Sequence, residues 1–229
     1  MKTMIVSLTF ILLATSAFAQ EGKMYIKGGF NLANVSISGD GRIDDARSLY
    51  SFNLGLTGDL PLGRFLALQP GLLFTGKGTK SQSGQPTDAT YFKASSNPYY
   101  IEVPLNLLVK IPLAGRSSSF FVGAGPYAAI GVAGKNKSEG KVFGVAFNSS
   151  KNIEFSNDDP ATFNEQEGAG FGIMRRFDFG LNGTAGVELN NVLLSVNYGY
   201  GLSKINSVEQ NSDDKNKHRV LSLSLGFRL

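Results

Sequence analysis

The chain alternates between apolar and small or polar residues over long stretches. In the segment 221–229 every odd-numbered residue is leucine or phenylalanine, and the residues between them are serine, glycine or arginine. A period of two places alternate side chains on opposite faces of a β-strand. The same alternation is weaker in 65–77 and 120–132, and it shifts after Ala33 in the first segment. We therefore predict eight strands, at 24–37, 50–60, 65–77, 99–111, 120–132, 177–189, 192–202 and in the last segment, which ends at Leu229.

The predicted strands are longer than those of most globular proteins. They span about 11 to 14 residues, whereas the usual strand has about 5–6. A tilted strand needs about 9–11 residues to cross a bilayer. Aromatic residues of the apolar set gather near one end of the strands, as in an interfacial girdle; they are Tyr50, Phe52, Phe74, Tyr99, Phe177, Phe179, Tyr198 and Tyr200. The lengths favour strands that cross a membrane.

The connections alternate between long and short. The polar connections 38–49, 79–98, 134–166 and 204–217 are long, and those around 61–63, 112–117 and 190–191 are short. Long external loops and short periplasmic turns are typical of outer-membrane barrels. An even number of strands also brings both ends of the domain to the periplasmic side. These features predict an all-β fold, an eight-stranded antiparallel up-and-down transmembrane β-barrel.

The first residues have the pattern of a secretory signal. Lys2 precedes an apolar stretch, and the segment ends with Ala17-Phe18-Ala19. A basic start, a short apolar middle and a small-x-small end are typical of a cleaved signal peptide. We expect residues 1–19 to be the signal peptide and 20–229 to be the barrel domain, exported to the outer membrane of a Gram-negative bacterium.

Composition excludes several classes of site. The chain has no cysteine and one histidine, which rules out a disulfide framework, a thiolate nucleophile and a multi-histidine metal site. The formal net charge of +4 is small, and no basic cluster along the chain indicates nucleic-acid binding. We expect no cofactor, no metal and no nucleic-acid partner.

Several glycine-rich and aromatic segments resemble a known family. They are Gly28-Gly29-Phe30-Asn31-Leu32-Ala33, Arg176-Phe177-Asp178-Phe179-Gly180-Leu181-Asn182, Gly186-Val187-Glu188-Leu189, Tyr198-Gly199-Tyr200-Gly201-Leu202 and Leu223-Ser224-Leu225-Gly226-Phe227. Their order and spacing resemble the PorT-like outer-membrane β-barrels typical of Bacteroidetes, an OmpA/OmpX-like eight-stranded barrel domain. The family usually ends on an aromatic residue, whereas this chain ends on Leu229. The resemblance implies the barrel fold. The namesake of the family assists secretion, but membership alone does not transfer that role; an envelope or secretion-machine protein is the partner that we expect.

Four charged residues on the predicted inner face lie near the periplasmic ends of their strands. They are Asp59, Lys110, Glu188 and Arg228. An eight-stranded barrel is just wide enough for side chains to fill its interior. These charges form either a hydrogen-bonded plug, which we favour, or a gated ion path. Nearer the external end, Glu102 and Asp178 either pair with Lys77, Arg175 or Arg176 or are solvated.

The single histidine is the only imidazole available for catalysis. Ser203, Ser207 and Ser212 lie in or beside the same loop as His218, but the chain has no Gly-x-Ser-x-Gly motif. His218 is either the catalytic base of a lipid-modifying enzyme or a solvated residue at the external rim. We favour the solvated residue.

The longest connection contains unusually apolar positions for a loop. Phe143, Phe147 and Phe155, together with Val142 and Val145, make 134–166 the expected contact region; alternatively this segment extends two strands into a protruding hairpin. We predict a non-enzymatic, monomeric barrel in contact with outer-membrane lipid, whose external loops bind or support an envelope complex. The alternatives are a narrow pore for ions or small solutes and a soluble periplasmic barrel, against which the long apolar stripes argue.

Overall fold

The computed structural model describes residues 22–36, 46–113, 118–156, 173–203, 205 and 217–229. The expected signal peptide, residues 1–19, lies outside this part. The described residues form twelve strands: β1 (Lys23–Ser36), β2 (Ala46–Pro61), β3 (Leu66–Gly76), β4 (Thr79–Ser83), β5 (Tyr91–Pro112), β6 (Ser118–Val142), β7 (Val145–Asn152), β8 (Glu154–Phe155), β9 (Ile173–Met174), β10 (Phe177–Leu189), β11 (Val192–Gly201) and β12 (Lys217–Arg228). Within these ranges there is no helix with the length and hydrophobicity to span a membrane.

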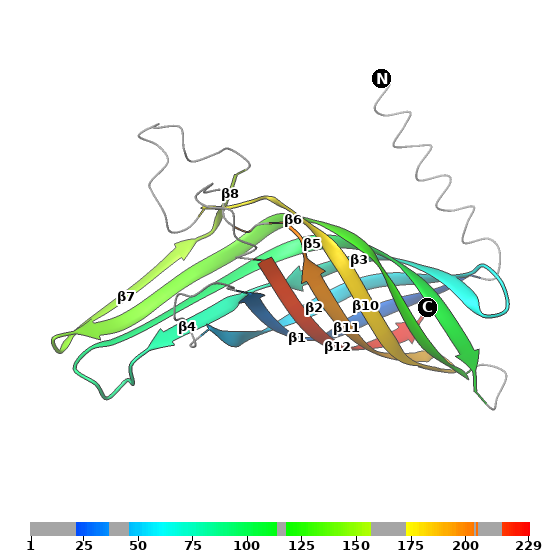
Figure 1. The fold of residues 1–229 in the computed structure, drawn as a ribbon, viewed down its shortest axis with the longest axis horizontal. Helices are drawn as coiled ribbons and strands as arrows, with labels where there is room; N and C mark the ends of the chain where they lie inside the picture. Colours follow the sequence, from blue (N-terminus) through cyan, green and yellow to red (C-terminus); the bar gives the residue numbers. More distant parts are fainter. Residues whose placement is uncertain (1–21, 37–45, 114–117, 157–172, 204, 206–216) are drawn as a thin grey trace, which may run out of the picture.

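Eight of these strands pair in a ring. β1 pairs with β2, and the antiparallel pairings continue through β3, β5, β6, β10 and β11 to β12. β12 in turn pairs with β1 from Tyr25↔Arg228 to Ser36↔Lys217, which returns the ladder to its first strand. These eight correspond one by one to the predicted strands. The all-β, antiparallel, up-and-down barrel predicted from the alternation is confirmed (Figure 1).

The two faces of the ring differ as the alternation requires. In β12, Leu223 is 54% exposed while its neighbour Ser224 is 2% exposed. The outer surface is leucine, valine, isoleucine and aromatic residues, and the buried positions of the lumen are largely asparagine, serine, threonine and charged residues. An apolar exterior around a polar interior is the arrangement expected for strands that meet acyl chains.

Two segments expected to be long loops are partly strands, and these strands extend the sheet beyond the ring. The expected loop 79–98 contains β4 and the first part of β5, and 134–166 begins with the end of β6 and then β7. β4 pairs with β2 and β5, and β7 pairs with β6. The hydrophobic alternation does not reveal these strands because most of their side chains on both faces are polar. We call β4, β7 and the adjoining parts 91–98 of β5 and 134–142 of β6 the extension.

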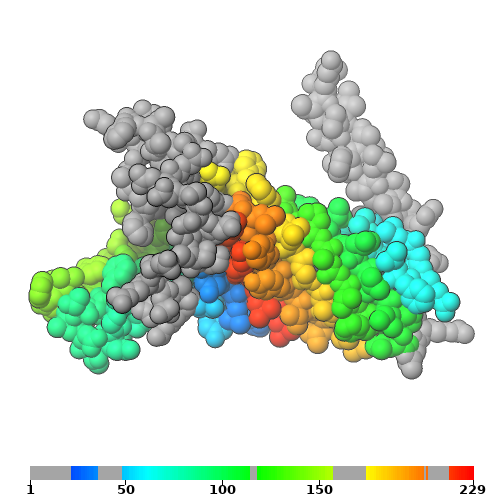
Figure 2. Space-filling view, viewed as in Figure 1, coloured from blue at the N-terminus to red at the C-terminus, as the bar shows by residue number. Residues whose placement is uncertain are grey.

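The extension projects from one end of the ring, and the C-terminus lies at the other end (Figure 1). Figure 2 shows its two hairpin tips reaching past the body of the barrel. In the β6–β7 tip, Phe143 and Gly144 have φ angles of 49° and 83°. Positive φ at both central residues is typical of the tight type I′ hairpin turn. The sequence offers a protruding hairpin of the strands 120–132 and 177–189 as an alternative to a loop. A hairpin does protrude, and β6 is its first strand, but its second strand is β7 and not 177–189.

A bulge marks the boundary between the ring and the extension. The β5–β6 register shifts between Tyr99 and Tyr100, which pair with Ala133 and Gly131 and leave Val132 without a partner in β5. Because side chains alternate with a period of two, one extra residue exchanges the two faces of β6 beyond this point. Odd-numbered residues of β6 face inward below the bulge and outward above it.

The orientation of the outer face can be tested at the middle of β12. Leu223→Arg places a charge on the lipid-facing surface near the centre of the strand, and we expect a loss of about 2–4 kcal/mol in the free energy of unfolding. Leu229→Arg, at the end of the chain, serves as the matched control with an expected loss of about 0–1 kcal/mol. Urea unfolding in lipid vesicles, followed by heat-modifiable gel mobility, measures both. Equal losses would contradict the assignment of this face.

Candidate functional site

The inward side chains of the ring fill the lumen, which we treat as the candidate site. At the end opposite the extension, Lys110 lies 2.6 Å from a carboxylate oxygen of Glu188 and also pairs with Asp59. Lys23 pairs with the other oxygen of Glu188, to which the Tyr25 hydroxyl donates at 2.8 Å. We call these five residues the lower cluster. Its two lysines and two carboxylates balance each other.

The structure thus brings together three of the four charges predicted for this end. Arg228 shares the inward parity, but its side chain is exposed and it takes part in none of the ion pairs of the described residues. It is the last residue of β12, where the wall of the barrel ends. Lys23, one residue before the predicted first strand, supplies the second cation instead. Extending the alternation of 25, 27 and 31 back by one step would have identified it.

A second charged group lies near the extension. The Lys77 ammonium is 2.6 Å from Glu102 and 2.8 Å from Asp178, and it lies 3.9 Å from the centre of the Tyr127 ring. Asp178 also accepts hydrogen bonds from Ser203 and, at 3.2 Å, from Tyr127. We call these five residues the upper cluster. Lys77 is 3% exposed, so the solvated alternative for Glu102 and Asp178 is wrong, and their cation is Lys77.

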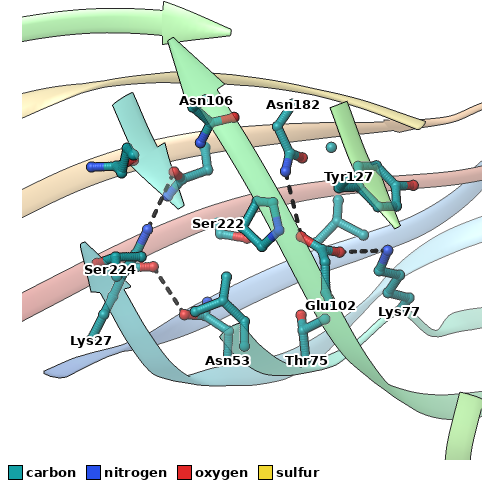
Figure 3. A pocket seen from close by; sticks show the side chains of 17 residues that line it. Lys27, Asn53, Thr75, Lys77, Glu102, Asn106, Tyr127, Asn182, Ser222 and Ser224 are labelled. Carbon is teal, nitrogen blue, oxygen red and sulfur yellow. Dashed lines mark hydrogen bonds and ion pairs between the residues drawn. The ribbon is translucent and has the colours of Figure 1, made fainter. Parts of the chain in front are cut away.

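Amide and hydroxyl groups elsewhere in the lumen form hydrogen bonds with one another. Asn31 donates to Thr75 at 2.9 Å and accepts from Asn53 at 2.6 Å. Asn53 accepts from Ser224 at 3.2 Å, and Lys27 donates to Asn197 at 3.3 Å. In Figure 3 both Lys77 and Asn182 point at the carboxylate of Glu102, which also acts electrostatically on Lys27.

The space left between these side chains is small. The cavity at mid-lumen measures about 40 Å³ and is lined by residues from every strand of the ring. A buried water needs at least about 10–15 Å³ of such space, so the cavity has room for about three or four waters. At the end opposite the extension a hollow of about 210 Å³ is lined by Lys23, Asp59, Lys110 and Glu188. The lumen is therefore open at this mouth and filled at its middle.

Aromatic side chains cover the mouth near the extension. His218 is 2% exposed, and its Nε2 lies 3.4 Å from the Tyr100 hydroxyl. Phe155 packs edge-on against Tyr100 with ring centres 5.8 Å apart. The expectation that His218 is a solvated rim residue is wrong. Ser203 is bound to Asp178, not to His218, and Ser207 and Ser212 lie outside the described residues.

Phe155 is also separated from the other predicted contact residues. It is half-buried at the mouth of the lumen, whereas Phe143 is 90% exposed at the β6–β7 tip. Phe147 lies near that tip and packs against Phe92 at 6.2 Å between ring centres. Within the described ranges no group of three or more His, Asp or Glu residues is placed to hold a metal ion.

Comparison with known proteins identifies the class of barrel. Residues 18–207 match the family model described as outer membrane protein beta-barrel domain. Similar solved structures include the attachment invasion locus protein Ail of Yersinia pestis, with 17% identity, TM-score 0.41 and coverage of 92% of this chain and 100% of that chain. OprG, an outer membrane protein of Pseudomonas aeruginosa, gives 13% identity, TM-score 0.42 and coverage of 91% of this chain and 96% of that chain. Neisserial surface protein A gives 16% identity, TM-score 0.38 and coverage of 90% of this chain and 96% of that chain. Comparison with curated proteins gave no match.

The upper cluster gives a testable energetic prediction. Lys77→Met leaves Glu102 and Asp178 buried without their cation, and we expect the free energy of unfolding to fall by about 3–5 kcal/mol. Adding Glu102→Gln and Asp178→Asn should restore most of the loss, because the uncompensated charges are then removed. Urea unfolding in vesicles measures both variants. Lys93→Met, which breaks an exposed ion pair with Glu139, is the matched control and should change little; a similar loss there would contradict the argument.

Proposed function

Because the chain belongs to the outer membrane protein beta-barrel domain family, we propose that it acts in the outer membrane as a non-enzymatic, monomeric barrel with a plugged lumen. On this proposal the extension binds another protein of the envelope. The single observation that carries the proposal is the contrast between a lumen filled with charged and polar side chains and a sheet that projects an apolar tip beyond it.

The lumen supports a structural role. Its buried and half-buried charges in the described part of the ring balance as four lysines and four carboxylates: Lys23, Lys27, Lys77 and Lys110 with Asp59, Glu102, Asp178 and Glu188. A buried charge without a partner is costly, so this balance stabilises the closed arrangement. A solute would have to separate these pairs to pass the mid-lumen cavity of about 40 Å³.

The tip of the extension supports a binding role. Phe143 and Val145 are 90% and 72% exposed, and Val142 is 48% exposed. These residues lie beyond the lipid-facing part of the sheet, so the acyl chains that cover Leu223 do not cover them. Contiguous apolar side chains in water are typical of protein interaction sites. A tight turn between paired strands holds them in place, which reduces the entropy lost on binding.

The plugged lumen can be tested by conductance. We expect the purified barrel to give no discrete conductance steps in planar bilayers, because the lower cluster and the mid-lumen hydrogen bonds block the path. Steps that change when Lys110→Met or Glu188→Gln removes a lower-cluster charge would overturn the plug and establish the narrow pore. Conductance that is insensitive to both variants would place the current outside this lumen.

The binding role can be tested by cross-linking in intact cells. A photoreactive residue in place of Phe143 should yield one defined protein adduct, because this side chain lies at the proposed contact. The same residue in place of Lys151, which is also exposed but sits down the β7 strand, is the matched control and should yield none. Heat-modifiable mobility confirms that each variant folds. The absence of any adduct at position 143, or identical adducts at both positions, would contradict the proposal.

A further inference from the structure

The outer face of the extension carries two rows of polar residues, with three lysines among them, that no function discussed so far uses. Pairing places Lys80, Ser95, Lys137 and Ser150 side by side across β4, β5, β6 and β7. Two residues closer to the ring, Asn97, Lys135 and Asn152 form a second row on the same face. Directly opposite side chains in such rows lie about 4.5–5.5 Å apart, so one ligand can contact several of them.

This face continues the lipid-facing surface of the barrel. The next position toward the ring is Tyr99, whose ring stacks on Phe74 at 5.2 Å and packs against Phe52 at 5.7 Å. These three rings belong to the predicted aromatic girdle, and girdle aromatics sit at the level of the lipid headgroups. Each step of two residues rises about 6.5 Å along the strand. The two rows therefore lie at and just above the headgroup level.

A groove where these rows meet the ring offers room for a headgroup. Its volume is about 740 Å³, and its apolar lining includes Tyr99 and Val132 from the outer face together with Leu49 and the buried Ile153. Its polar lining includes Ser95, Asn97, Lys135, Lys137 and Asn152. Apolar contacts on one side with hydroxyl, amide and ammonium groups on the other match a phosphorylated sugar attached to acyl chains.

The lysines of these rows are available for an anion. Lys135 and Lys137 are exposed, and neither these two nor Lys80 forms an ion pair with any described residue. The acidic residue of the same face, Glu139, is paired with Lys93. The hydrogen bond from Lys93 lowers the pKa of Glu139, which therefore stays ionised and paired at neutral pH. The rows keep a net positive charge.

We propose that Lys80, Lys135 and Lys137, with the groove beside Tyr99, bind the phosphate groups of an anionic glycolipid in the outer leaflet. The acyl chains of this lipid lie along the apolar wall below, and its sugar occupies the groove. The inference rests on the placement of the barrel in the outer membrane and is independent of the plugged lumen and of any protein bound at the tip.

The test uses the full-length barrel folded in detergent and native mass spectrometry. The probes are bisphosphorylated lipid A, the same acylated disaccharide without phosphates, and the disaccharide bisphosphate without acyl chains. We expect retention of the first probe only, because the site needs both the phosphates and the acyl chains. Equal retention of the dephosphorylated lipid, or of the soluble bisphosphate, would overturn the proposal.

Variants locate the site on one face of the extension. The double variant Lys135→Gln, Lys137→Gln should bind bisphosphorylated lipid A roughly 25-fold more weakly, from about 1 kcal/mol per basic side chain near an anionic surface. Lys151→Gln is the matched control, because the register Asn136↔Lys151 puts this lysine on the opposite face of the same hairpin. It should bind like the unaltered chain. An equal loss in the control, or no loss in the double variant, would overturn the assignment, and heat-modifiable mobility shows that both variants fold.

Discussion

The whole structure follows from the need of every peptide group in hydrocarbon to find a hydrogen-bond partner within the protein. A flat sheet would leave two edges unpaired. Here the ladder that begins at β1 returns to it through β12, with pairing from Tyr25 to Ser36. Closure with eight strands then fixes the width of the interior, and that width allows side chains but little else.

This barrel has a polar interior and an apolar exterior, the reverse of a water-soluble protein. The lumen of this barrel must be polar because alternate residues face away from lipid, yet it is too narrow for bulk water. Each charge in it therefore needs a specific partner. Lys77 lies between two carboxylates, and Glu188 accepts from Lys23, Tyr25 and Lys110. The apolar exterior allows the barrel to contact acyl chains, while the polar interior determines which single arrangement of strands is stable.

The period of two carries much of this information in the sequence itself. It predicts the eight strands of the ring and brings Asp59, Lys110 and Glu188 to one end of one face, since parity and depth are local properties. It does not show that the Arg228 side chain is exposed, that Phe155 packs on Tyr100, or that His218 is buried, because each depends on contacts between distant segments. The extension is missed for another reason. Both of its faces are largely polar, so no alternation marks its strands, and its lysines gather only when separate strands are placed in register.

The extra residue Val132, which has no partner in β5, decides which residues of β6 face outward in the extension. Without it, Lys135 and Lys137 would face the axis of the barrel, above Lys77 and His218. With it, they face outward, and no further lysine is added to the interior beside Lys77. The presence or absence of one residue thus decides whether this stretch of β6 turns its lysines to the interior or to the surface. Insertion or deletion at this point moves both charges to the other face without replacing either lysine.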